Sequence, residues 1–407
     1  MTEKPISLEV LAPAGDMERL QSALLYGADA VYLAGQQFGM RSGCPNFSMD
    51  ELRQAVDLCH RKHKSVHVTC NVVPHGYELD SIAEFLTECG HIGVDAFIIS
   101  DLGVMALARR CAPQVPVHVS TQAGVMNEET ARFLYEQGAA RVVLARELSL
   151  QEVARIRANT PAELEIETFV HGSMCVSFSG RCLLSNYFTG RDGNHGDCAQ
   201  PCRWKYSLVE EKRPGQYFPI EEDGRGTYIL NSRDMRMIDR ISDLIEAGVT
   251  SLKIEGRAKS AYYVACVTQA YRHAVDFAVQ HPHEPLPDWI LQETEKVSHR
   301  PYTHGFFDGV APGQDTIRGG YERGYEVAAV CEGRENGLLK VSQRNRFFLG
   351  ETFDVLAPGQ KPFALTPTRL FNADGEPIES APHAVMTVYM ETDVDVPVGA
   401  YLRRVRT

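Results

Sequence analysis

The sequence lacks a long apolar run. Nowhere in its 407 residues are there about 18 consecutive apolar residues, the length that a membrane-spanning helix needs. The first residues, Met-Thr-Glu-Lys-Pro, carry no apolar signal segment. We therefore expect a chain that has no membrane span and that lies in the cytoplasm.

Several common catalytic motifs are missing as well. There is no G-x-G-x-x-G and no Walker lysine loop, so the sequence gives no sign of a dinucleotide or P-loop site. H-E-x-x-H and G-x-S-x-G are also absent, which argues against a protease that uses either motif. The formal net charge of −12 argues against non-specific coating of nucleic acid, which depends on many basic contacts to phosphates.

Cysteine, by contrast, is concentrated in one place. Of the 11 cysteines, four lie within the segment His171–Trp204 and seven are scattered singly. Thiols that converge in a loop rich in Gly, Asn, Asp and Ser are typical ligands of a soft metal centre. The four are Cys175, Cys182, Cys198 and Cys202.

Several interpretations of these four cysteines remain open. An iron–sulfur cluster needs soft ligands and tolerates irregular spacing. Structural zinc usually has two tight cysteine pairs, and only Cys198 and Cys202 form one. Disulfides are rare in the cytosol. We favour the iron–sulfur cluster and keep zinc, redox or catalytic thiols, and unrelated structural cysteines as alternatives. His171 and His195 are candidate substitute ligands.

The first part of the chain alternates short apolar runs with helical patterns. Such alternation predicts parallel strands joined by helices, and eight units predict a closed (β/α)8 TIM-type barrel rather than a doubly wound open sheet. One helix is expected over Leu150–Ala158, because Ser149 and Glu152 form a capping box at its start. The eight runs are Leu8–Ala12, Ala30–Ala34, Ser65–Asn71, Ala96–Ser100, Val117–Thr121, Arg141–Ala145, Glu165–His171 and Ser251–Glu255.

The interval after the seventh strand is too long for a single helix. This insertion, at about residues 172–228, carries the four cysteines and leaves from the C-terminal end of that strand. TIM-barrel enzymes place their sites on that face. We therefore predict that the insertion lies over the mouth of the barrel. The simpler alternative is a structural metal site that orders the long loop and has no part in catalysis.

Charged and polar residues close several of the apolar strands at the same expected face. Burying a charge is costly unless it is paired or meets a ligand, so these residues are candidates for a binding site. We predict that Arg146, Lys253 and Arg257 clamp an anionic small molecule, each Arg through its bidentate fork. The alternative is that they pair with Glu147, Glu167 and Glu255. The candidate catalytic residues are His171 and Glu255, and further substrate-binding candidates are Arg41, Asn71 and Gln122.

Residues 313–407 differ in character from the 1–312 segment that holds the predicted barrel. Short strand-like runs separated by Gly and Pro predict a small all-β domain, of a barrel-like kind. It carries 11 basic and 13 acidic residues and is therefore far less acidic than the rest. Basic and aromatic residues lie together in it, which suits RNA, because bases stack on rings and phosphates pair with arginines. Ordinary strand aromatics with solvated charges are the alternative. The arginines concerned are Arg344, Arg346, Arg403, Arg404 and Arg406.

Several motifs together resemble the collagenase-like peptidase family of the U class. The longest is Glu167-Thr-Phe-Val-His-Gly-Ser-Met-Cys175-Val-Ser-Phe-Ser-Gly-Arg-Cys182-Leu-Leu-Ser185, and the matches extend roughly over Leu8–Tyr302. Shorter matches are Leu11-Ala-Pro-Ala-Gly15, the stretch Tyr26–Tyr32, Cys198-Ala-Gln-Pro-Cys-Arg-Trp204, Asn231-Ser-Arg-Asp234 and Ser251-Leu-Lys-Ile-Glu-Gly-Arg257.

The resemblance implies an activity. Members of that family once described as proteases are oxygen-independent hydroxylases that carry a 4Fe-4S cluster and depend on prephenate. It therefore implies a 4Fe-4S cluster on the four cysteines, prephenate as co-substrate and an electron donor as a further partner. In length and in its terminal β domain the chain is similar to the members that act on tRNA. For those members the partner is the tRNA anticodon loop, and the product is 5-hydroxyuridine at the wobble position.

Three other functions remain as alternatives. The first is a peptidase, in which Ser173 or Cys175 would be the nucleophile and His171 the base. The second is an accessory protein with a structural metal that binds RNA or a partner without catalysis. The third is a hydroxylase of a non-RNA substrate such as a quinone precursor. The added β domain favours RNA over a small substrate.

Overall fold

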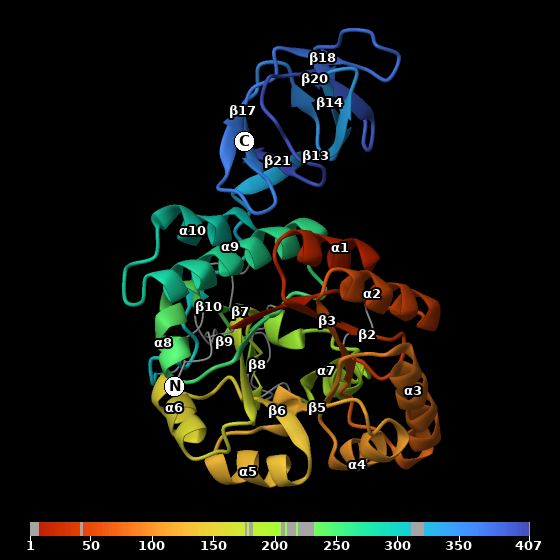
Figure 1. Ribbon diagram of the computed structural model, residues 1–407, viewed down its shortest axis with the longest axis vertical. Coiled ribbons are helices and arrows are strands. Elements are labelled where there is room, and N and C mark those ends of the chain that lie inside the picture. Colours follow the sequence, from red (N-terminus) through yellow and green to blue (C-terminus); the bar gives the residue numbers. More distant parts are fainter. Residues whose placement is uncertain are drawn as a thin grey trace.

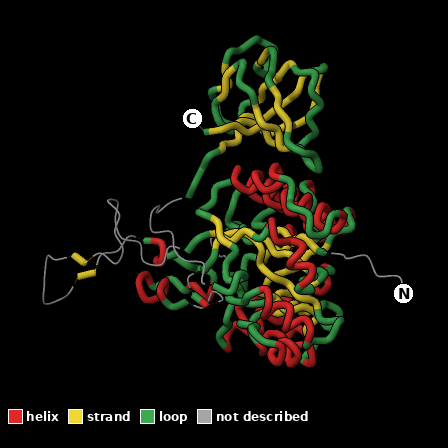
Figure 2. Tube along the Cα trace, turned by 90° about the vertical axis from the view of Figure 1, so that its left-hand side faces the viewer, coloured by secondary structure: helices red, strands yellow, loops and turns green. Residues whose placement is uncertain are grey.

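The computed structural model describes residues 8–40, 44–175, 177–178, 182–204, 208–209, 217–218, 232–310 and 321–406. Figure 1 shows a barrel surrounded by helices and, beside α9 and α10, an all-β domain. In the perpendicular view of Figure 2 the strands of the β domain form a separate body next to the helix-rich barrel. Among the described residues, no helix has the length and apolar character needed to cross a bilayer.

The barrel is a closed sheet of parallel strands, which confirms the predicted TIM-type fold. The hydrogen-bonded order is β11-β1-β2-β3-β4-β5-β6-β7, and pairing of β7 with β11 closes it. All eight predicted apolar runs are strands of this sheet. Their bounds are β1 Glu9–Pro13, β2 Ala30–Ala34, β3 Ser65–Cys70, β4 Ala96–Ile99, β5 Val117–Val119, β6 Ala139–Val143, β7 Glu165–Ser173 and β11 Ser251–Ile254.

Helices cover the outside of this sheet, and their starts follow from local sequence. In α6 (Leu150–Ala158) the Ser149 hydroxyl accepts the Glu152 N–H and the Glu152 carboxylate accepts the Ser149 N–H, as predicted. The longest, α9 (Ala261–Gln280), begins at Ser260 and buries most of its small and aromatic side chains. The other covering helices are α1 Met17–Leu25, α2 Met49–Arg61, α3 Leu79–Ile92, α4 Leu102–Cys111, α5 Glu128–Glu136 and α8 Ile241–Glu246.

The C-terminal domain is an antiparallel β-sheet with its own apolar core, as predicted. The order of its strands is β17-β16-β21-β13-β14-β20-β18. Its core includes Phe347, Phe353 and Leu402. The predicted domain boundary after residue 312 falls within 311–320, outside the described residues. The strands are β13 Tyr325–Glu335, β14 Leu338–Gln343, β16 Phe353–Leu356, β17 Phe363–Leu365, β18 Arg369–Phe371, β20 Thr387–Glu391 and β21 Tyr401–Val405.

Buried polar contacts fix the β domain to the barrel. The Arg403 side chain on β21 is 0% exposed and donates to both carboxylate oxygens of Glu293, at 2.8 and 2.6 Å. Glu293 ends α10 (Asp288–Glu293), so this bidentate pair joins the two domains. The Tyr26 hydroxyl of the barrel donates to the carbonyls of Leu356 and Gly399 in the β domain, each at 2.9 Å.

These contacts correct the RNA-binding role predicted for two arginines. Arg403 is buried in the domain interface, where it pairs with Glu293, and Arg404 forms ion pairs with Glu326 and Glu351. In a strand, alternate side chains point to opposite faces, and the sequence did not indicate which face of β21 meets the barrel. Arg344, Arg346 and Arg406 are exposed.

We expect Arg403→Ala to lower the free energy of unfolding by about 2–3 kcal/mol, because it removes a charged, bidentate partner of the buried Glu293. Lys296 keeps one contact to Glu293, at 2.8 Å, which limits the loss. Arg406→Ala, two residues along and exposed, is the matched control and should change stability by less than about 0.5 kcal/mol. Urea unfolding measures both variants. Equal stabilities would contradict the role of Arg403 in the interface.

Candidate functional site

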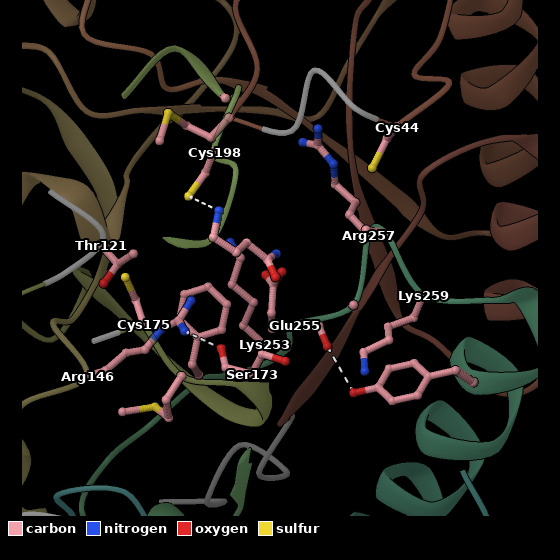
Figure 3. A pocket seen from close by; sticks show the side chains of 18 of the residues that line it. Cys44, Thr121, Arg146, Ser173, Cys175, Cys198, Lys253, Glu255, Arg257 and Lys259 are labelled. Atoms are coloured by element: carbon pink, nitrogen blue, oxygen red, sulfur yellow. Dashed lines mark hydrogen bonds between the residues drawn. The ribbon is translucent and has the colours of Figure 1, made fainter. Parts of the chain in front are cut away.

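A cavity of about 750 Å³ lies at the C-terminal ends of the barrel strands. Strand ends, the cysteine insertion and the start of the β domain all contribute to its wall. Figure 3 shows Arg146 and Cys175 on one side and Cys44, Arg257 and Lys259 on the other. This is the face on which TIM-barrel enzymes place their sites, and the volume falls within the range of ligand pockets.

The cavity brings together ten of the predicted site residues. They share a position at the end of a barrel strand or in the cysteine insertion. Arg41, another predicted substrate-binding residue, lies outside the described residues. The ten are Asn71, Gln122, Arg146, Lys253, Glu255, Arg257, Cys175, Cys182, Cys198 and Cys202.

His171, predicted to be catalytic, is not among the residues that line the cavity. Lys253 pairs with Phe169 and Ile254 with His171, so the register of β7 slips by one residue at Val170. The slip reverses the alternation of side chains and turns His171 away from the barrel interior. Its ring packs against Tyr271 and Tyr302, at centroid distances of 5.5 and 5.4 Å. Burial, and then the nearby Arg236, lower the pKa of His171 well below its usual value.

Two arginines reach the cavity from opposite sides. The Arg257 guanidinium donates to Thr69 Oγ1 and Asn46 Oδ1, both at 3.1 Å, and is buried. Arg146 donates to the Ser173 carbonyl at 3.0 Å, and its guanidinium lies 3.8 Å from the centre of the Phe169 ring. These contacts fix the orientation of the two guanidinium groups. Both arginines line the cavity.

Lys253 differs from the two arginines, because it is paired. Its Nζ lies 2.7 Å from Glu167 Oε1, and Glu167 also accepts from Arg141 at 2.9 Å. Burial alone would raise the pKa of Glu167, but Lys253 and Arg141 outweigh it and lower that pKa to about 2. For Lys253 the alternative of pairing with a barrel carboxylate therefore holds. Its ammonium still lines the cavity, 4.6 Å from the centre of the Tyr32 ring.

The four cysteines of the insertion all contribute to the cavity wall. Cys175 and Cys198 are exposed, Cys182 and Cys202 are half-buried, and none forms a disulfide. The Leu184 and Gln200 N–H groups donate to the sulfurs of Cys182 and Cys198, each at 3.4 Å. Such N–H···S bonds stabilise thiolates and tune iron–sulfur centres.

Four thiols are a suitable set of ligands for an iron–sulfur cluster, but in this structure they are not close enough together to coordinate one. Among the described residues, no three His, Cys, Asp or Glu side chains lie close enough together to hold a metal ion. Metal ligands are rarely preformed in a protein without its metal, so the loop would have to close around a cluster. His195, considered as a substitute ligand, lies 2.9 Å from Asp192 and 3.5 Å from Glu78 and is not part of the cavity wall.

The sequence did not predict one wall of the cavity. Residues at the start and end of the β domain line it together with the strand ends, namely Tyr321, Arg323, Tyr325, Glu326, Val327 and Arg406. A bridge between His299 and Glu322 fixes the start of the β domain to the barrel. The Tyr321 ring also packs against Lys259 and Arg300, at 4.1 and 4.6 Å. Contacts this far apart in the chain leave no local sequence pattern. Cys44, a fifth thiol in the wall, stood alone in the sequence and gave no signal either.

The geometry also bears on the peptidase alternative. Ser173 and Cys175 line the cavity, but the candidate base His171 does not, and its Nε2 contacts the Tyr302 hydroxyl at 3.5 Å. A nucleophile and its base must lie within hydrogen-bond reach of each other. The described residues therefore form no Ser–His or Cys–His pair with His171 at this site.

The fold and the cavity together define a class of TIM-barrel proteins. In this class a cysteine-rich insertion and a C-terminal β domain form part of the wall of the cavity at the barrel mouth. Residues 15–316 match the model of "Peptidase family U32", and residues 323–403 match "Peptidase family U32 C-terminal domain". The chain belongs to peptidase family U32, which confirms the resemblance seen in the sequence.

Curated relatives cover most of this chain. It is 35% identical over 434 residues to "tRNA hydroxylation protein P" of Escherichia coli, covering 95% of this chain and 94% of that protein. It is 33% identical over 410 residues to "tRNA hydroxylation protein P1" of Bacillus subtilis, covering 99% and 96%. It is 36% identical over 313 residues to the E. coli "23S rRNA 5-hydroxycytidine C2501 synthase", covering 75% of this chain and 46% of that protein.

Proposed function

We propose that this protein is an RNA-modifying enzyme that hydroxylates tRNA, with a 4Fe-4S cluster on Cys175, Cys182, Cys198 and Cys202 and with prephenate as co-substrate. The product would be 5-hydroxyuridine at the wobble position, formed without molecular oxygen: the ring hydroxyl of prephenate would supply the oxygen atom to uracil C5, and prephenate would take up the displaced hydrogen and so be the two-electron oxidant. The observation that carries the proposal is that the four cysteines share one cavity with Arg146, Lys253 and Arg257. The names of the relatives support hydroxylation of RNA, and two of them support tRNA as the substrate.

Each group in the cavity has a part in this proposal. A bound 4Fe-4S cluster held by all four thiolates would supply electron transfer next to the substrates, and a Lewis-acidic iron would require one of the four thiols to leave its iron open. Prephenate carries two carboxylates, which suit the two guanidinium groups on opposite sides of the cavity. Glu255 also lines the cavity and is the remaining candidate for moving a proton. A uracil in an anticodon loop is already single-stranded, so it can enter the cavity at little cost in unstacking.

The β domain keeps a role in binding tRNA, but through fewer arginines than the sequence predicted. Arg323 and Arg406 are exposed and line the cavity. They extend the positive side chains of the barrel mouth toward solvent, where phosphates of a bound loop would lie. We therefore place the phosphate contacts at Arg323 and Arg406.

The test of the function uses protein purified without oxygen. Iron and sulfide are measured first, and the protein is then incubated with tRNA transcripts, an electron donor and either prephenate or no prephenate. We expect about four irons per chain and one added oxygen atom on the wobble uridine, seen by mass spectrometry only when prephenate is present. Iron-free protein, or RNA that gains no oxygen, would reject the proposal.

The anion clamp has its own test. We expect Arg257→Ala to weaken prephenate binding by about 1.5–3 kcal/mol, the scale of a charged hydrogen bond, while the iron content stays the same. Calorimetry on the iron-loaded protein measures the affinity, and Arg53→Ala on the outer surface of α2 is the control. Arg257→Lys keeps the charge but loses the fork, and should fall between wild type and Arg257→Ala. Unchanged affinity in both Arg257 variants and in Arg146→Ala would refute the clamp.

A further inference from the structure

Exposed rings gather near the mouth of the barrel. The Tyr77 side chain is 82% exposed and that of Tyr187 is 83% exposed. Tyr77 lies in the short helix η1 (Gly76–Glu78) between β3 and α3, and Tyr187 lies in α7 (Leu184–Thr189) of the cysteine insertion. Exposed aromatic side chains on the loops of the barrel's C-terminal face are candidates for an interaction surface. We call Tyr77, His75, His195, Tyr187 and Phe188 the aromatic rim.

Three of these rings form a column of nearly parallel planes. His195 stacks on His75 at 5.5 Å with an interplanar angle of 11°. His75 stacks in turn on Tyr77 at 5.4 Å and 10°. The column thus joins the cysteine insertion to the loop after β3, and it ends at a tyrosine that is almost fully exposed. The exposed end of a column of parallel rings presents a flat surface on which one more ring can stack.

The aromatic rim lies directly behind the wall of the cavity. Gly193 and Gly196 line the cavity, and His195 between them packs on the other side of the same loop. In α7 the buried Ser185 lines the cavity, and Tyr187 follows two residues later. Tyr187 and Phe188 meet edge to face at 5.5 Å. The rim and the cavity wall therefore share the cysteine insertion.

We propose that the aromatic rim stacks the single-stranded nucleotides that flank the base held in the cavity, with Tyr77 and Tyr187 as the principal stacking residues. This inference rests on the proposed function. A base drawn into the cavity leaves its neighbours without a stacking partner, and aromatic side chains replace that partner with little dependence on sequence. A flat ring column matches a nucleobase better than the curved aliphatic surface of a docking protein.

The charges near the rim separate stacking from phosphate binding. His195 lies next to Glu78 and Asp192, and Arg191 of the same loop is paired with Asp197 at 2.7 Å, so this side of the mouth attracts phosphates only weakly. The cations Arg323 and Arg406 belong to the β-domain wall instead. RNA binding should therefore have two separable parts, which are stacking on the rim and salt-dependent phosphate contacts at the β domain.

The experiment measures binding of an anticodon stem–loop RNA to iron-loaded protein at several salt concentrations by fluorescence anisotropy. We expect Tyr77→Ala and Tyr187→Ala each to raise Kd about 5-fold or more, with an unchanged slope of log Kd against log salt. Tyr77→Phe should bind as wild type, because it keeps the ring. Phe133→Ala, which removes a ring that is 51% exposed on α5, should also bind as wild type. Arg406→Ala should instead reduce the slope.

Two controls make the result decisive. Iron content and the melting temperature of each variant show whether the insertion is still folded, and Tyr187→Trp should rescue binding if stacking is the cause. The proposed stacking role of the aromatic rim would be overturned if both alanine variants bound RNA with wild-type affinity, or if Phe133→Ala lost as much affinity as they did. Either result would leave the proposed function intact. Wild-type protein that neither binds nor hydroxylates the RNA would instead reject the proposed function.

Discussion

Replacing Cys182 with alanine is expected to remove most of the bound iron and to abolish tRNA hydroxylation. The same result is expected for Cys175, Cys198 and Cys202, because each substitution removes one of the four thiolates that are proposed to hold the cluster. All four line one cavity, and the sulfurs of Cys182 and Cys198 already accept backbone N–H bonds. Iron and sulfide analysis of protein purified without oxygen measures the loss.

Cysteines elsewhere in the barrel provide the matched controls. Cys59 and Cys89 are buried in α2 and α3, and burial raises the pKa of each thiol to about 12. A thiol that stays protonated is not a metal ligand, so Cys59→Ala and Cys89→Ala should keep their iron. Cys44→Ala is the sharper comparison, because Cys44 lines the same cavity without belonging to the insertion. Equal iron content in insertion variants and controls would show that the four cysteines are not the ligands.

Glu167→Gln is expected to lower the free energy of unfolding by about 3–5 kcal/mol, because it leaves the buried Lys253 and Arg141 without their shared carboxylate. The Glu167 side chain is 0% exposed and contacts both cations, at 2.7 and 2.9 Å. Urea unfolding measures the loss. Glu165→Gln is the control: that carboxylate also pairs with Arg141 at 2.7 Å but is 47% exposed, and its loss should cost less than about 1 kcal/mol.

The pH dependence gives an independent check on Glu167. Its folded pKa of about 2 lies below the unfolded value of about 4.3, so its contribution is fully present above pH 4.3 and is lost toward pH 2. The difference in stability between wild type and Glu167→Gln should therefore be constant near neutral pH and should narrow below about pH 4.3. A difference that stays the same down to pH 3 would mean that packing, not charge, causes the loss.

The ion pair between Lys253 and Glu167 explains why the role of Lys253 was predicted only in part. Its place at the end of an apolar strand indicated a functional or paired cation, and the sequence offered a ligand clamp or pairing with Glu147, Glu167 or Glu255. Only the register of β7 against β11, which places Lys253 beside Phe169, brings its ammonium to Glu167. Arg146 and Arg257 contact other groups, among them the Ser173 carbonyl and the Thr69 hydroxyl. Sequence order alone could not separate these cases.

The sequence by itself determined the barrel, the position of the insertion and the set of thiols. Each of these depends on a local pattern: apolar strand runs, a capping box, or cysteines close together in the chain. The tertiary structure decided how those pieces meet. A one-residue slip at Val170 removed His171 from the cavity, and the docking of β21 on α10 buried Arg403. The return of Tyr321–Val327 to the barrel supplied the missing wall. These outcomes depend on strand register and domain packing between distant residues, and no local pattern encodes such contacts.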